Sequence, residues 1–151
     1  MVTIIPSYVY SIFAAIVVGT IIVSSCSLSM VNIKNEAENQ QLANIDEYVA
    51  TQSLILVTHV TEDGQNTTQF LNLPSQIGNQ EYCICLANDS SSAWVESGFG
   101  TAVLQGQPQI YIPAEVSASG VFISGWGRAF LQCYYQNQIV TLTLTSEGLN
   151  C

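Results

Sequence analysis

The chain has 151 residues, of which 48% are hydrophobic and only 9% are charged, and its formal net charge is -9. This length fits one domain with a modest core. Because Lys34 and Arg128 are the only basic side chains, no surface can neutralise a run of phosphates, which excludes nucleic acid as a partner. One histidine and few acids leave little from which to build a catalytic site, so we expect neither enzymatic activity nor a cofactor.

The N-terminal third begins with an apolar segment. Residues 1–33 contain no Asp, Glu, Lys or Arg, and residues 8–23 are apolar except for Ser11 and Thr20. A run of this length is typical of a membrane-spanning helix, and Pro6 suits the first turn of a helix because no partner is needed for its missing N–H. A secretory signal peptide is the alternative, although it requires a basic region that is not found before the apolar run.

The helical pattern continues beyond the apolar segment as an amphipathic stalk. Apolar residues recur at spacings of three, four and seven, at Leu42, Ile45, Val49 and Leu56. A single helix over residues 6–57 would be about 75 Å long, more than twice the thickness of a bilayer core. This apolar stripe could pack on the chain's own C-terminal domain or on a neighbouring copy. We therefore expect a helical part over residues 1–60, hydrophobic over 1–33 and amphipathic over 34–60, although residues 54–60 could also begin a strand.

Residues 61–151 have the pattern of a small β-domain. Short apolar or alternating runs are separated by Gly, Pro, Asn and Ser, and they predict strands at 68–73, 82–87, 93–96, 109–112, 121–123, 129–135 and 139–145. We expect flexible connectors at 117–120 and 125–127, and a tight turn at Gln136 and Asn137 between the last two strands. The last strand should carry a Thr-rich face that is exposed or half covered. The chain is therefore predicted to be α+β, with a long N-terminal hydrophobic helix and a small antiparallel β-sandwich or barrel.

Four of the five cysteines lie in the predicted β-domain, at Cys83, Cys85, Cys133 and Cys151. Cys83 and Cys85 are two residues apart on one predicted strand, so they are poorly placed to bond to each other. We expect two disulfides that join them to Cys133 and Cys151, with a zinc site from the same four thiols as the alternative. Cys26 is then either a small apolar helix residue or, after Val23-Ser24-Ser25, the lipidated residue of a lipobox-like tetrapeptide.

Two N-x-[ST] sequons, at Asn66 and Asn88, fall in predicted loops. They are candidates for glycosylation. Together with disulfides they indicate an exposed, extracytoplasmic domain.

The order of apolar helix, amphipathic stalk and small β-domain resembles the archaeal type IV pilin and archaellin superfamily. Within the β-domain, the predicted strand 68–73 runs into Leu73-Pro74-Ser75-Gln76-Ile77-Gly78 and then Tyr82-Cys83-Ile84-Cys85-Leu86. This passage of about 20 residues is similar to the "strand, LPxxIG, YxIxL" passage of archaeal pilin-like surface proteins. The resemblance implies that residues 1–33 pack in the core of a helical filament, with core positions at Tyr8, Ile12, Phe13, Ala15, Ile16, Val18 and Ile22.

The resemblance implies a cell-surface, extracellular filament for adhesion or motility, built as a homo-oligomer from subunits held in the membrane before assembly. The sequence departs from the superfamily, because pilin precursors carry a basic leader before the apolar run and many carry a Glu early in the mature helix. Two alternatives therefore stay open. The chain could be a single-pass membrane-anchored β-sandwich module that contacts a surface glycan or the cell wall, or an accessory or stator-like subunit of a surface filament.

No catalytic motif accompanies the few reactive side chains. His59 is the only histidine, and no G-x-S-x-G, H-E-x-x-H or Gly-rich phosphate loop is present. We therefore interpret His59 as a surface or helix-capping group. The aromatic residues Trp94, Phe99, Trp126, Tyr134 and Tyr135 could form a carbohydrate-binding face, although core and inter-subunit contacts are the favoured interpretation.

Overall fold

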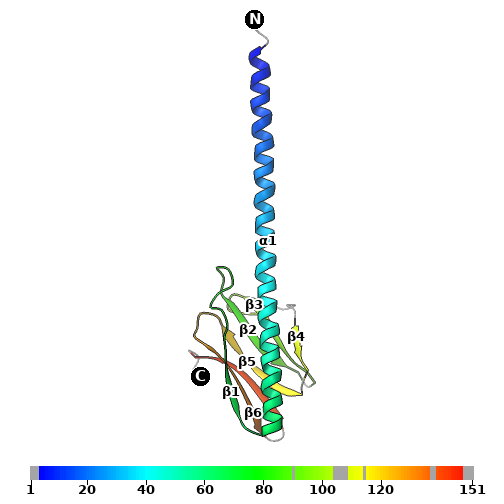
Figure 1. The fold of residues 1–151 in the computed structure, drawn as a ribbon, viewed down its shortest axis with the longest axis vertical. Helices are drawn as coiled ribbons and strands as arrows, with labels where there is room; N and C mark the ends of the chain where they lie inside the picture. Colours follow the sequence, from blue (N-terminus) through cyan, green and yellow to red (C-terminus); the bar gives the residue numbers. More distant parts are fainter. Residues whose placement is uncertain (1–3, 90, 104–108, 114, 137–138, 148–151) are drawn as a thin grey trace. The chain divides into compact units, whose positions relative to one another are not determined.

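The computed structural model describes residues 4–89, 91–103, 109–113, 115–136 and 139–147, and within these residues one helix is followed by seven strands (Figure 1). Helix α1 spans Ile4–Asp63 without interruption, so residues 54–60 are helical. The helix ends where Gly64 adopts a φ of 67° and its N–H donates to the carbonyl oxygen of Val60, 3.0 Å away. A glycine with positive φ is the usual residue at this position, because it has no Cβ to clash.

The chain divides into two compact units, residues 1–39 and residues 40–151. The boundary lies within α1, whereas the sequence pattern placed it after residue 60. The helical segment from Gln40 onward groups with the strands because its apolar stripe is buried in the core of the second unit.

The second unit contains a seven-stranded sheet formed by the described strands, in the order β1-β6-β7-β5-β2-β3-β4. The strands are β1 (Thr67–Leu71), β2 (Tyr82–Asn88), β3 (Ala93–Phe99), β4 (Gln109–Ile112), β5 (Val116–Ile123), β6 (Ala129–Gln136) and β7 (Ile139–Ser146). Every pair is antiparallel except β5 with β7, which is parallel. All seven predicted strands are confirmed, and so is the α+β class.

One sheet holds all the described strands, where the sequence pattern suggested a sandwich or barrel. The reason is that the second half of α1, rather than a second sheet, covers the apolar face (Figure 1). Val49 and Val60 of the helix are buried in one cluster with Ile84, Leu131 and Leu142 of the sheet. Alternation along each strand sends the polar residues to the opposite face, which we call the outer face. On β7, Thr141 and Thr143 are half-buried there and Thr145 is exposed, as expected.

The expected connector at 117–120 is instead part of β5. This segment pairs with β7 in parallel register, with Ala118 opposite Leu142 and Gly120 opposite Leu144. Gly120 has a φ of 121°, and a Cβ at this position would lie 2.1 Å from the carbonyl oxygen of Leu144. Gly120, one of the small residues that suggested a flexible connector, is therefore required by the close approach of two strands.

Candidate functional site

The first unit carries an apolar helical surface. The large apolar side chains of α1 between Tyr8 and Ile33 are 41 to 76% exposed, and the helix is long and apolar enough to cross a membrane. The residues predicted to face a filament core are all exposed in the single chain, namely Tyr8, Ile12, Phe13, Ala15, Ile16, Val18 and Ile22. Burying this surface against lipid or protein would contribute roughly 25 cal/mol per Å2 of apolar area.

Five serine and threonine hydroxyl groups within this apolar surface bond to the backbone of their own helix. The side chains of Thr20, Ser24, Ser25, Ser27 and Ser29 donate to carbonyl oxygens three or four residues earlier, at 2.8 to 3.0 Å. Their hydroxyl protons are therefore paired without any outside partner. Cys26 is an exposed free thiol on the same segment, and its lipidation stays a prediction.

The amphipathic stripe packs on the chain's own β-domain. Leu42, Ile45, Val49 and Leu56 are each buried in the core of the second unit. Of the two partners that the sequence left open, the structure therefore uses the domain of the same chain.

The same side of α1 buries a carboxyl group. Asp46 is 4% exposed, and the hydroxyl of Ser97 donates to its Oδ2 at 2.5 Å. Burial raises the pKa of Asp46 to about 6, although the bond from Ser97 lowers it in part. Burial and the nearby Asp46 carboxyl also raise the pKa of Tyr82, whose hydroxyl donates to the carbonyl oxygen of Pro74 at 2.6 Å.

The described cysteines are free thiols, and Cys151 lies outside the described residues. Cys133 is on β6 and faces the core, whereas Cys83 and Cys85 are on β2 and face the outer side. Two strands separate β6 from β2, which corresponds to about 14 Å at a strand spacing of about 4.8 Å. This exceeds the limit of about 7 Å between the Cα atoms of a disulfide, so the expected bridge from Cys83 or Cys85 to Cys133 is wrong. Pairing with Cys151 stays a prediction.

The thiols of Cys83 and Cys133 lie in surroundings that disfavour the thiolate. Burial raises the pKa of Cys83 and raises that of Cys133 to about 11. Within the described ranges, no three His, Cys, Asp or Glu side chains lie close enough together to hold a metal ion.

Both sequon asparagines are exposed. Asn66 precedes β1, and its Oδ1 accepts from the backbone N–H of Tyr135 at 3.4 Å. Asn88 ends β2, and its Nδ2 donates to the carbonyl oxygen of Asp89 at 3.3 Å. Ser90, which completes the second sequon, lies outside the described residues.

The five aromatic residues considered for one carbohydrate-binding face are not brought together. Phe99 packs against the core, Trp126 is exposed after β5, and Tyr134 and Tyr135 point to opposite faces of β6. Trp94 instead pairs with Tyr111 on the outer face, and Phe70 pairs with Phe130 near the β1 edge. The sequence pattern could not show these pairs, because each depends on the register between two strands. Trp94 lies opposite Tyr111 where β3 pairs with β4, and Phe70 lies opposite Phe130 where β1 pairs with β6.

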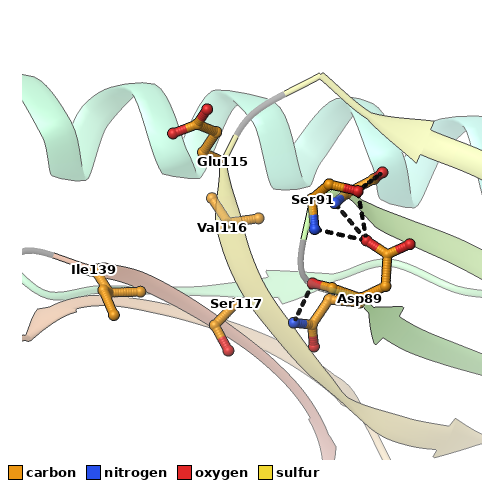
Figure 2. A pocket seen from close by; sticks show the side chains of 8 residues that line it. Asp89, Ser91, Glu115, Val116, Ser117 and Ile139 are labelled. Atoms are coloured by element: carbon orange, nitrogen blue, oxygen red, sulfur yellow. Dashed lines mark hydrogen bonds between the residues drawn. The ribbon is translucent and has the colours of Figure 1, made fainter.

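A polar cleft of about 490 Å3 lies where β2, β5 and β7 meet their connecting turns (Figure 2). Figure 2 shows Ile139 and Ser117 on one side, Asp89 with Ser91 on the other, and Glu115 above them. The Oδ1 atom of Asp89 accepts from the N–H groups of Ser91 and Ser92 at 2.8 and 2.7 Å, and these bonds lower the pKa of Asp89. The cleft therefore contains a carboxylate that stays charged at neutral pH.

His59 lies outside these features. It is exposed on α1, and its Nδ1 is 4.0 Å from Oδ2 of Asp63 one helical turn away.

No protein-family model matches the chain, and comparison with curated proteins and with solved structures finds no match either.

Proposed function

We propose that the chain is a structural subunit of an extracellular type IV pilus-like filament, assembled through the apolar half of α1. The observation that supports this proposal is the exposed apolar surface on all sides of residues 8–33, on a helix that continues into the core of a β-domain. An apolar surface of this extent is not stable in water, so it must lie in lipid or against other helices.

Burial against copies of the same segment is consistent with its residues. Ala14, Ala15 and Gly19 allow close approach of neighbouring helices, and nothing lies within 4 Å of a Cβ built at Gly19. Contacts that repeat from copy to copy without closing on themselves produce an open helical fibre. The β-domain would then face outward, toward whatever the filament contacts.

The alternative of a single-pass anchor is supported by the same apolar surface, since the helix is long enough to span a bilayer. An anchor needs no helix–helix contact, and it would leave the chain monomeric in the membrane. The two proposals therefore differ in what surrounds residues 8–33.

Replacing Ala15 by Asp tests the filament. A carboxylate among apolar helices costs several kcal/mol in every subunit, so Ala15→Asp should abolish fibres that the unchanged chain forms, as seen by negative-stain electron microscopy. Ala43→Asp is the matched control, because Ala43 is exposed on the same helix outside the apolar segment. Fibres of normal yield and length from Ala15→Asp would contradict the proposal.

A further inference from the structure

The outer face of the sheet carries two aromatic rings close to the β4 edge. Trp94 of β3 lies opposite Tyr111 of β4, with ring centroids 6.2 Å apart and an angle of 59° between the rings. Tyr111 is 59% exposed and Trp94 is half-buried. On its other side Trp94 lies opposite Ala87 of β2, whose side chain is small.

Hydrogen bonds hold these rings in place. The Nε1 atom of Trp94 donates to Oε2 of Glu96 at 3.2 Å, and Nε2 of Gln109 donates to the same oxygen at 3.3 Å. The hydroxyl of Tyr111 donates to Oε1 of Gln109 at 3.4 Å. We call these four residues the aromatic platform. A network of this kind fixes the rings before any ligand arrives, which reduces the entropy lost on binding.

The platform borders, through Tyr111, one of two adjacent clefts. Tyr111 lines a cleft of about 450 Å3 together with Ser91, Ser92, Pro113 and Glu115. Ser91, Ser92 and Glu115 also line the cleft shown in Figure 2. The two clefts are therefore neighbours. The residues that they share provide hydroxyl groups, from Ser91 and Ser92, and the carboxylate of Glu115 next to the platform. Both volumes fall within the range of about 300 to 1,000 Å3 that is typical of ligand sites.

We propose that the aromatic platform and these two clefts bind a neutral glycan. A sugar ring has an apolar C–H face that packs on an aromatic ring, and a rim of hydroxyls that bond to carboxylate, amide and hydroxyl groups. The two hydrogen bonds that Glu96 accepts within the described residues both go to Oε2, which leaves Oε1 to accept from a sugar hydroxyl.

The charge of the site determines which glycans fit. Glu96, Asp89 and Glu115 are acidic, and none of the described residues that line either cleft is Lys or Arg. The whole chain has a net charge of -9. An anionic polymer would be repelled, so uronate and sulfated glycans are excluded as ligands.

This inference deepens the proposed function, because a filament built from this chain would present the platform on its outward β-domain. Its test uses dispersed full-length chains, so that failure to bind glycan and failure to form fibres are separate results.

The experiment measures the binding of fluorescently labelled cellohexaose, mannohexaose and chitohexaose to the full chain in a sugar-free detergent, by fluorescence anisotropy. At least one of these neutral hexasaccharides should bind saturably, and labelled hexagalacturonate should not. Asn88→Gln removes the sequon at the cleft, so that an attached glycan cannot compete for the site. Absence of saturable binding at millimolar concentration, or preference for hexagalacturonate, would overturn the proposal.

Substitutions then locate the site. Trp94→Ala and Tyr111→Ala should each weaken binding about tenfold, because each removes one stacking surface. Tyr111 is on an edge strand and exposed, so Tyr111→Ala provides a folded variant, checked by circular dichroism, even where Trp94→Ala does not fold. Tyr135→Ala is the control, since this exposed tyrosine lies on β6 and should leave affinity unchanged.

Unchanged affinity of a folded Tyr111→Ala chain would place the ligand elsewhere and overturn the inference. A second copy is the competing occupant of the platform. If Tyr111→Ala impairs fibre formation while the unchanged chain binds no neutral hexasaccharide, the platform is a contact between subunits instead.

Discussion

Asp46 links the folding of this chain to pH. Its carboxyl group is buried between α1 and the sheet, where Ser97 supplies one hydrogen bond to Oδ2, while Oδ1 has no partner among the described residues. Burial disfavours the charged form and raises the pKa from 3.8 to about 6. The folded state therefore binds a proton more readily than the unfolded state does.

Stability should consequently fall as pH rises. The contribution of protonated Asp46 is fully present below pH 3.8 and is lost as pH rises through about 6. The difference between the two pKa values corresponds to at most about 3 kcal/mol in the free energy of unfolding. Chemical denaturation between pH 4 and 8 should show this decline in the unchanged chain, and Asp46→Asn should remove it.

Glu47→Gln is the matched control, because Glu47 is exposed on the same helix beside Asp46. It should leave the pH dependence of the unfolding free energy as it is in the unchanged chain. A decline of equal size in Asp46→Asn would assign the pH dependence to other groups.

The spacing of Asp46 along the helix places it on the buried stripe, whereas the chemistry of its side chain predicts an exposed position. It lies four residues after Leu42 and three before Val49, on the buried stripe. Carboxyl groups are rarely buried, so the spacing alone does not indicate that Asp46 lies in the core. The partner Ser97 lies 51 residues away, and nothing local indicates that contact.

At the level of elements, the existence of each strand was predictable from the sequence, whereas the pairing and order of the strands were not. The predicted strands were indicated by short apolar or alternating runs, a signal contained within the strand itself. The first half of β5 was missed because Ser117, Ser119 and Gly120 have weak strand propensity, and its pairing with β7 is decided by a distant segment. Strand order, which separates Cys133 from Cys83, is also non-local and invisible to residue spacing.

Gly120→Ala should destabilise the β-domain by about 3 kcal/mol or more. The added methyl group would combine a disfavoured positive φ with a clash against the backbone of Leu144, and backbone atoms cannot rotate away. The free energy of unfolding, measured by denaturant titration, gives the magnitude.

Gly100→Ala separates the two causes. Gly100 has a φ of 93° but nothing within 4 Å of an added Cβ, so it reports the backbone strain alone and should cost about 1 to 2 kcal/mol. Equal losses in the two variants would show that the close approach of β5 to β7 adds nothing.

On the scale of the whole molecule, the β-domain depends on the second half of α1. Leu42, Ile45, Val49, Leu56 and Val60 are buried against the sheet, and each contributes roughly 1.5 to 3 kcal/mol by its burial. Their sum is comparable with the entire stability of a domain, which is about 5 to 15 kcal/mol. The sequence pattern predicted the stripe and its spacing, but its partner became clear only from the sheet.

A fragment of residues 62–151 should therefore aggregate or remain unfolded, because the apolar face of its sheet would be open to water. A fragment of residues 40–151 keeps the covering helix and should be monomeric and unfold cooperatively. Size-exclusion chromatography and thermal unfolding of the two fragments give the comparison. A monomeric, cooperatively unfolding 62–151 fragment would contradict the dependence.

The internally paired hydroxyls of α1 bear on how easily the helix could change its surroundings. Thr20, Ser24, Ser25, Ser27 and Ser29 donate to carbonyl oxygens of their own helix, so these bonds need not be exchanged when lipid is replaced by protein. For a subunit that moves from bilayer to fibre, as proposed, these five hydroxyl groups would then add no barrier in either direction. For these positions, entry into the fibre and return to lipid would then depend on how closely neighbouring helices pack, since their hydroxyl groups keep the same partners in both surroundings.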